Sequence, residues 1–143
     1  MTLPGLDDER DARAQQRLRH EQEVWMTTVR SDGQPQASPV GFLWDGTGFL
    51  VLSRPGSQKV RNLRGNASVA LHLEIDQRAE DDGGVVTLEG TASLDPDPIG
   101  EQEAAVYLEK YEEAMRSAGL TPEELFAEYS AVIRVEPTRI RVY

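Results

Sequence analysis

The sequence predicts a mainly β (α+β) fold, a six- to eight-stranded antiparallel barrel with peripheral helices. Short runs rich in β-branched and aromatic residues are separated by turn signals such as Asp32-Gly33 and Asp45-Gly46. Strands and helices do not alternate along the chain, so a parallel sheet is not expected. The 143 residues contain no linker and no internal repeat, which indicates one domain over residues 1–143. Closure into a barrel would leave few exposed sheet edges.

The first half of the chain predicts three strands in an antiparallel meander, over residues 24–30, 36–44 and 49–53. The two Asp-Gly pairs fall at the turns, where positive φ angles are needed. Two further strands are expected over residues 67–75 and 85–94, with a polar turn at residues 81–84 between them. In the first of these, alternation places four apolar side chains on one face: Val69, Leu71, Leu73 and Ile75.

Capping signals predict the helices of the first half. Residues 1–23 are polar and indicate a peripheral N-terminal helix, capped near Asp7 or Asp8. A short helix is expected between strands, with Ser57 as its N-cap and Gly65 as the residue just past its end.

The second half predicts a long helix over residues 99–117, packed outside the barrel. Five side chains lie on or beside its core stripe: Ala105, Leu108, Tyr111, Glu112 and Met115. Thr121 as cap and Pro122 at the first position begin another short helix. Residues 131–143 predict one or two strands, broken at Pro137.

The composition excludes several kinds of chemistry. The chain has no cysteine, which excludes disulfides and thiolate catalysis, and its two histidines, His20 and His72, are far apart in the sequence. No ligand spacing suggests a metal site. The polar N-terminus does not resemble a signal peptide, and no apolar run reaches membrane-spanning length, so we expect a cytoplasmic protein without membrane contact. The net charge of -10 argues against nucleic acid as a partner.

The charge is unevenly distributed. Residues 46–73 contain no aspartate or glutamate, although Asp and Glu number 25 in the whole chain. The same window holds four cations: Arg54, Lys59, Arg61 and Arg64. A basic island in an acidic protein is suited to binding a small anion; the alternative is a chance distribution.

Lys59 indicates where such an anion would bind. It lies in the first turn of the expected short helix, where a cation is unfavourable because the helix N-terminus is itself partly positive. A phosphate at this terminus could be held by backbone N–H groups, the Ser53 and Ser57 hydroxyls and the Lys59 ammonium. The alternative is a solvated lysine, which costs only about a few tenths of a kcal/mol. In either case we expect the Lys59 side chain to be exposed.

Three stretches of the sequence match a known family: WMTTVRSDGQPQASPVGFLWDG, FLVLSRPGSQKVRNLRGNASVALHL and VVTLEGTASL. They resemble the pyridoxamine 5'-phosphate oxidase-like (PPOX class) superfamily, whose members have a split β-barrel of the FMN-binding type. More narrowly, the chain resembles the branch of deazaflavin (coenzyme F420)-dependent reductases. The shared pattern is a strand, an Asp-Gly turn and a Pro-Val hairpin. A Ser at the end of the third strand, then Lys and Arg-Asn-Leu on a short helix, complete it.

The resemblance implies two groups of cofactor-binding residues. The first group would contact or lie near the cofactor phosphate: Ser53, Ser57, Lys59, Arg61 and Asn62. The second group would form the strand against which the flavin-like ring lies: Gln36, Ser38, Pro39, Val40 and Gly41. Pro39 lacks an N–H and Gly41 lacks a side chain, so a flat ring could approach this backbone closely. The alternative is that both residues serve only a bulge in the strand.

The chain also departs from parts of the superfamily. Its end, RIRVY, lacks the arginine and tryptophan arrangement of true pyridoxamine-phosphate oxidases, so that substrate is not expected. With two histidines it matches the histidine-rich haem-degrading relatives poorly. His72 is expected to be structural or barrel-lining. Trp25, Trp44 and Tyr143 are expected in the core or at a dimer interface.

The resemblance implies an oxidoreductase in which reduced coenzyme F420 delivers hydride to an unsaturated small-molecule substrate. The cofactor carries the reacting carbon, so no catalytic side chain is assigned. Two alternatives stay open, an FMN-dependent enzyme of the same fold and a non-catalytic protein that binds a flavin or another planar ligand.

Relatives bind their cofactor between two subunits, so a homodimer is expected. Residues 36–44 are apolar on both faces, with Val40, Phe42 and Trp44 on one and Ala37, Pro39 and Leu43 on the other. One face can fill the barrel, and a twofold partner would cover the other.

Overall fold

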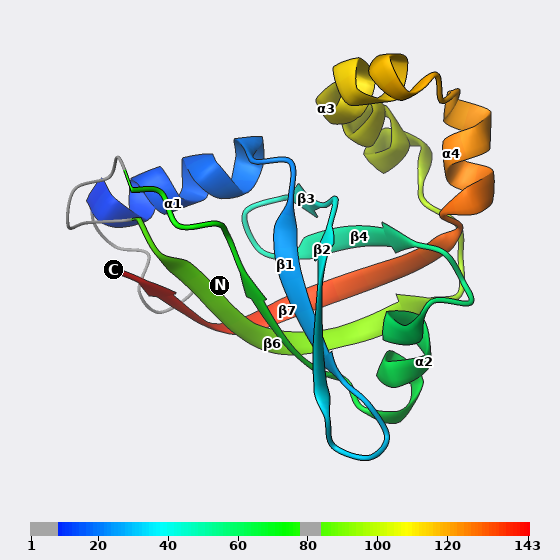
Figure 1. Cartoon of the computed structure of the whole chain (residues 1–143). Coiled ribbons are helices and arrows are strands. Elements are labelled where there is room, and N and C mark those ends of the chain that lie inside the picture. The colour runs from blue at the N-terminus through cyan, green and yellow to red at the C-terminus, as the bar shows by residue number, and fades with distance from the viewer. Residues whose placement is uncertain (1–8, 78–83) are drawn as a thin grey trace.

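The computed structural model describes residues 9–77 and 84–143, which form a single antiparallel sheet and its surrounding helices (Figure 1). The elements in chain order are α1 (Glu9–His20), β1 (Val24–Val29), β2 (Pro35–Val40), β3 (Leu43–Trp44), β4 (Phe49–Ser53), α2 (Gln58–Gly65), β5 (Ser68–His72), β6 (Val86–Asp95), α3 (Glu101–Ala118), α4 (Pro122–Glu128) and β7 (Ala131–Val142). Within the described residues the sheet has seven strands in the order β2-β1-β5-β6-β7-β4-β3, curled into a split half-barrel. The predicted fold class is thereby confirmed. The expected cap at Asp7 or Asp8 and the turn at residues 81–83 lie outside the described residues.

The expected meander of three strands is wrong. The strand predicted over residues 36–44 is interrupted at Gly41 and Phe42; β2 pairs with β1, while β3 pairs with β4. β2 and β3 are the two edge strands of the sheet, at opposite ends of the strand order, although they follow one another directly in the sequence. Val40, Phe42 and Trp44 are all buried, so the alternation of buried and less buried side chains continues through the break. The apolar pattern of the sequence therefore does not reveal that the strand is interrupted.

Side chains of α3 replace the missing ladder bonds at this break. The Phe42 N–H donates to the Tyr111 hydroxyl at 2.8 Å. The Lys110 ammonium donates to the Phe42 carbonyl, also at 2.8 Å. Because both polar groups of the Phe42 backbone have partners, the chain can leave one sheet edge and join the other without an unsatisfied buried group.

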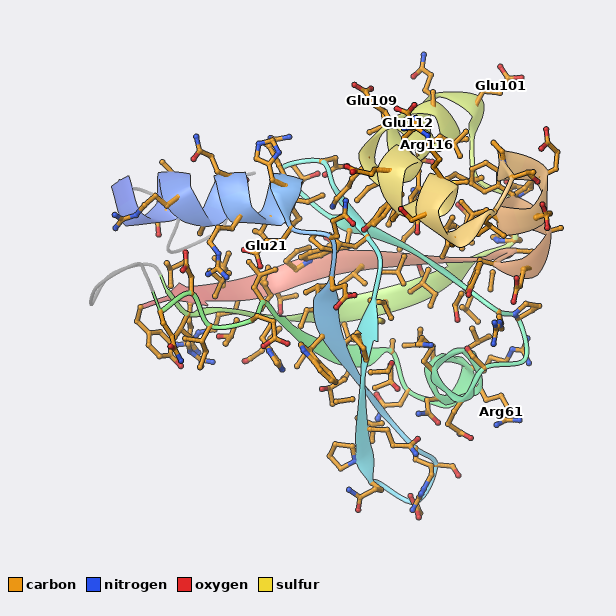
Figure 2. All side chains as sticks on the ribbon, turned by 45° about the horizontal axis from the view of Figure 1, so that its top comes forward. Glu21, Arg61, Glu101, Glu109, Glu112 and Arg116 are labelled. Carbon is orange, nitrogen blue, oxygen red and sulfur yellow. The ribbon has the colours of Figure 1, made fainter. Side chains whose placement is uncertain are left out.

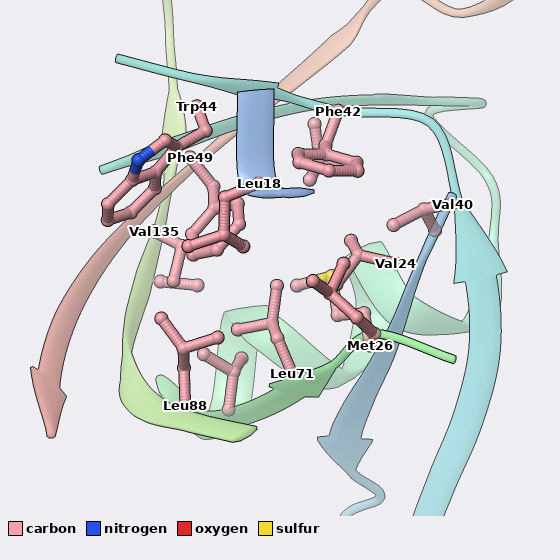
Figure 3. Packing of buried hydrophobic residues seen from close by; sticks show 14 of the residues in the cluster. Leu18, Val24, Met26, Val40, Phe42, Trp44, Phe49, Leu71, Leu88 and Val135 are labelled. Atoms are coloured by element: carbon pink, nitrogen blue, oxygen red, sulfur yellow. The ribbon is translucent and has the colours of Figure 1, made fainter. Parts of the chain in front are cut away.

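The interior of the barrel is an apolar core to which most strands contribute (Figure 3). Met26, Phe42, Leu71 and Leu88 are nearly inaccessible, and Leu18 of α1 closes one end of the barrel. A second apolar cluster joins the outer side of β4 and β7 to α3 and α4: Leu50, Leu52, Tyr107, Met115, Leu125 and Val132. The long helix therefore packs outside the barrel as predicted, at the end of β7 opposite to α1 (Figure 1).

The predicted caps are partly confirmed. The Ser57 hydroxyl caps α2 by accepting from the Val60 N–H at 3.4 Å, and Thr121 forms a capping box with Glu124 at the start of α4. The predicted end of α2 is wrong, because Gly65 lies inside the helix and Asn66 is its C-cap. Among the described residues no helix is long and apolar enough to cross a membrane.

Pro137 does not break the last strand, contrary to expectation. β7 runs continuously past it and pairs with β6, with a register shift at Glu89 and Gly90. A Cβ on Gly90 would lie 2.5 Å from the Glu136 carbonyl oxygen, so only glycine lets the two backbones approach here. The bulge accommodates a proline that a regular ladder position would reject.

Two expectations for single side chains are also wrong. Ile75 is 66% exposed because β5 ends at His72, before the predicted alternation reaches residue 75. On α3, Ala105 and Glu112 are exposed, and Tyr107 is buried in their place. The packed face of α3 is therefore rotated from the predicted stripe toward Tyr107.

Candidate functional site

A cavity of about 470 Å³ lies where the end of β2, the end of β4 and the start of α2 meet α3 and α4. Six of the ten residues predicted to bind a cofactor line it: Pro39, Val40, Gly41, Ser53, Ser57 and Lys59. These residues come from two stretches of sequence. Their common position follows from the path of the chain, which leaves β2 at Gly41 and returns through β4 to Ser53.

The other four predicted residues do not line this cavity. Arg61 is exposed, points outward from α2 (Figure 2), and donates to Gln58 at 2.7 Å. Asn62 is buried and donates to the Thr28 hydroxyl and to the Gln36 side chain, each at 3.0 Å. Ser38 is half-buried on β2. A role for Gln36, Ser38, Arg61 and Asn62 in cofactor binding stays a prediction.

The polar end of the cavity is a cluster of hydroxyls and cations. The Ser53 and Ser57 hydroxyl oxygens are 2.9 Å apart, and Ser53 is only 3% exposed. Lys59 is half-buried beside them, so the expectation of an exposed side chain is wrong. Burial and the nearby Arg54 lower the pKa of Lys59 below its usual value. In the part of the chain that the structure describes, Lys59 has no acidic partner, and the first turn of α2 contains no acidic residue.

Arg54 links the two sides of the cavity rim. Its guanidinium donates to Glu128 of α4 at 2.5 and 3.0 Å and lies 5.3 Å from the centre of the Tyr129 ring. The ion pair with Glu128 raises the pKa of Arg54. The loop before α2 is therefore tied to α4. Glu128 pairs with Arg54 and makes no ion pair with the neighbouring Lys59.

The opposite wall is aromatic and apolar, and the sequence analysis did not identify it. It includes Tyr107, Tyr111 and Met115 of α3 with Leu125 and Tyr129 of α4 and beyond. The rings of Tyr107 and Tyr111 are packed together, with centroids 4.7 Å apart. Their spacing of four residues is the available sequence signal, since it places both on one helix face. That signal does not reveal which part of the sheet the face packs against.

Gly41 is where the α3 wall approaches the strand most closely. A Cβ at Gly41 would lie 3.0 Å from the Tyr107 hydroxyl and 3.3 Å from the Tyr111 hydroxyl. The glycine therefore serves the contact between strand and helix. Burial raises the pKa of Tyr107 to about 12 and that of Tyr111 still further, so both hydroxyls stay protonated near neutral pH.

The histidines do not belong to this site. His72 is exposed on the outer face of β5 and stacks on Trp25, with ring centroids 6.2 Å apart, so it does not line the barrel interior. Neither His72 nor His20 lines the cavity. Within residues 9–77 and 84–143 no cluster of three or more potential metal ligands occurs.

A second cavity, of about 920 Å³, lies over β3, β4, β6 and β7. Arg134 lines it but donates to both carboxylate oxygens of Glu103 at 2.8 Å and to Asp95 at 2.7 Å. That guanidinium is neutralised within the chain. Arg19 is the other cation of this cavity, but three acidic residues also line it: Asp45, Glu103 and Glu136. Among the described residues, no acidic side chain lines the first cavity, which is therefore the better candidate for an anionic ligand.

Comparisons with known proteins agree with the fold. The chain is similar to an F420 reductase structure, with 26% sequence identity and a TM-score of 0.65, covering 89% of this chain and 94% of that one. It is similar in fold to the haem storage protein HutZ from Vibrio cholerae, with 21% identity and a TM-score of 0.67 over 96% of this chain and 94% of that one. General Stress Protein 26 from Bacillus anthracis shares the fold at 19% identity, with a TM-score of 0.64 over 90% of this chain and 89% of that one. No curated protein matches the sequence. The family model of pyridoxamine 5'-phosphate oxidase matches residues 11–143, and the chain therefore belongs to that family.

Proposed function

We propose that this protein is an oxidoreductase that binds coenzyme F420 in the cavity of about 470 Å³ and transfers hydride to an unsaturated small-molecule substrate. The observation that carries the proposal is the two-ended character of the cavity. One end has hydroxyls and a half-buried cation without an acidic partner among the described residues, and the other end is aromatic and apolar. A ligand with a flat ring at one end and a phosphate at the other would match these two ends of the cavity.

The phosphate would lie beside Lys59 at the start of α2. Free N–H groups in the first turn, the two serine hydroxyls and the ammonium can all donate to phosphate oxygens. Burial is the main cause of the lowered pKa of Lys59, and repulsion from Arg54 adds to it; a bound dianion would offset that repulsion. The phosphate would thus supply the negative charge that the described residues do not place beside Lys59.

The ring would lie between the Pro39–Gly41 strand and the wall formed by α3 and α4. When bound in its reduced form, the cofactor supplies the hydride. The residues of the chain would hold the ring, Met115 and Leu125 of the cavity lining would exclude water from it, and one side would stay open to a substrate. No acid or base from the chain is required for that role.

FMN is the alternative cofactor, and non-catalytic binding of a flavin or another planar ligand is the alternative activity. The similarity to an F420 reductase favours the deazaflavin. Its tail carries additional carboxylates, and Arg54, Arg61 and Arg64 are exposed on α2 or just before it. Similarity to a haem storage protein also raises haem as a ligand. No imidazole lines the cavity to ligate its iron, so we favour the flavin class.

The test is a fluorescence titration with coenzyme F420 and with FMN, using the wild-type protein, Lys59→Ala and Arg64→Ala. Loss of the charge-assisted bond should weaken binding by about 1.5–3 kcal/mol in Lys59→Ala. Arg64→Ala removes the same charge from the exposed end of the same helix and should have little effect on the binding of FMN, which lacks the additional carboxylates of the F420 tail. If Lys59→Ala binds both cofactors within twofold of wild type, the phosphate assignment is wrong. Tight binding without oxidation of reduced F420 by any unsaturated acceptor would favour the non-catalytic alternative.

A further inference from the structure

Tyr107 has a hydroxyl that no described residue of the chain engages. The residue is 7% exposed and lines the cavity, and its hydroxyl lies 3.0 Å from the place where a Cβ of Gly41 would be. Among the residues that the structure describes, this hydroxyl has no hydrogen-bond partner. A hydroxyl at a cavity wall that has no partner in the chain is free to bond to a ligand atom that enters the cavity.

The neighbouring Tyr111 provides a contrast within the same helix. Its hydroxyl accepts from the Phe42 N–H at 2.8 Å and donates to the Gln22 carbonyl at 2.7 Å. Both tyrosines line the cavity and their rings are in contact. Both rings contribute to packing, and the Tyr111 hydroxyl holds the backbone through its hydrogen bonds. The Tyr107 hydroxyl has no such structural role among the described residues.

The Tyr107 hydroxyl is suited to act as a donor. Burial holds its pKa at about 12, so the proton stays on the oxygen throughout the neutral range. Aliphatic and aromatic carbon dominate the wall around it, with Met115 and Leu125 close by in the same cluster. In such surroundings a single donor discriminates strongly between ligands that offer an acceptor and ligands that do not.

We propose that the Tyr107 hydroxyl donates a hydrogen bond to a carbonyl oxygen on the ring of the bound cofactor, and thereby makes this cavity selective for planar rings that carry an oxo group. This inference rests on the proposed function, because flavin and deazaflavin rings both carry such carbonyls. It assigns the two ends of the cavity different tasks. Lys59 recognises the phosphate, and Tyr107 recognises the ring.

The experiment compares Tyr107→Phe with Tyr111→Phe, using coenzyme F420 and FMN as probes. Tyr107→Phe should weaken binding by about three- to tenfold, since one neutral hydrogen bond is lost. It should leave the melting temperature unchanged or slightly higher. The visible absorption band of the bound cofactor should shift, because the hydrogen bond acts on the absorbing ring itself. Tyr111→Phe should instead lower the melting temperature, because the Phe42 N–H loses its acceptor.

A double variant separates this inference from the phosphate assignment. Tyr107 and Lys59 would act on different parts of the ligand, so their effects on the dissociation constant should multiply in Tyr107→Phe/Lys59→Ala. Wild-type affinity together with an unshifted absorption band in Tyr107→Phe would overturn the role of Tyr107 and leave the proposed function standing. Failure of the wild-type protein to bind either cofactor would overturn both.

Discussion

Two lysines in this protein have their pKa lowered by burial, yet they have different surroundings. Lys59 lies at the cavity with no acidic partner among the described residues, beside another cation. Lys110 is bonded to the Phe42 carbonyl and lies 3.8 Å from the centre of the Phe42 ring. The first arrangement leaves a positive charge available to a ligand, whereas the second uses the charge to hold the backbone that crosses from β2 to β3.

Lys110 gives a pH dependence that can be measured. Burial lowers its pKa from 10.5 to about 8 in the folded protein, although Glu21 partly opposes the shift. Between these two values the unfolded chain binds more protons than the folded one, so this group makes stability rise with pH. Relative to Lys110→Met, the wild type should gain about 1–2 kcal/mol in unfolding free energy between pH 7 and pH 10. Denaturant titrations at both pH values test this, and a difference that does not change with pH would contradict it.

At the scale of single residues, the sequence predicts those parts of the site that lie in short motifs. Ser53, Ser57 and Lys59 follow one another around the start of one helix, so local capping and charge rules identify them. The tyrosines of α3 are nearly fifty residues further along, and only packing brings them to the strand. Both tyrosines line the cavity, yet the sequence analysis placed only Tyr111 in the core stripe, and no local rule identifies either residue as part of the site.

At the scale of the elements, hydrogen bonds from one buried polar side chain, Asn62, connect α2 to the sheet. Asn62 donates to Thr28 on β1 and Gln36 on β2 and accepts from Gln58 at 2.8 Å. Thr28 is 2% exposed and Asn62 is 5% exposed, so solvent cannot readily replace these bonds. The position of the helix start, and hence of Lys59, therefore depends on Asn62.

The variant Asn62→Ala tests this anchoring. It leaves buried partners unsatisfied and should lower the free energy of unfolding by about 1–3 kcal/mol. Arg64→Ala, an exposed change on the same helix, should alter it little. Chemical denaturation of both variants measures the difference. Equal stability of Asn62→Ala and wild type would show that α2 does not depend on these bonds.

The elements also show where sequence reasoning stops. Caps and Asp-Gly turns were predictable because each depends on a few adjacent residues, and Gly33 and Gly46 have the positive φ angles of 90° and 96° that such turns need. The division of residues 36–44 into β2 and β3 was not predictable. It depends on Lys110 and Tyr111 bonding to Phe42 from nearly seventy residues away. Likewise, Pro137 is tolerated in β7 because of Gly90 on the facing strand.

At the scale of the whole molecule, the edge strand β2 exposes several side chains and its end adjoins the cavity. The hairpin of β1 and β2 extends beyond the rest of the sheet (Figure 1). Along β2, Pro35, Ala37 and Pro39 are exposed while Val40 enters the core. Of the two apolar faces predicted for residues 36–44, one therefore fills the barrel, and the other lies largely open beside the cavity.

We expect a second copy of the chain to cover that open face, which would place the cofactor at a twofold interface. Light scattering at micromolar concentration should give about twice the chain mass of 15.9 kDa. Ala37→Glu places a charge on the exposed face without touching the residues that line the cavity, so it should produce a monomer and weaken cofactor binding. Ala12→Glu, at an exposed position of α1, is the matched control and should stay dimeric. A monomeric wild-type protein that binds one cofactor per chain would show that the cavity is complete within a single chain.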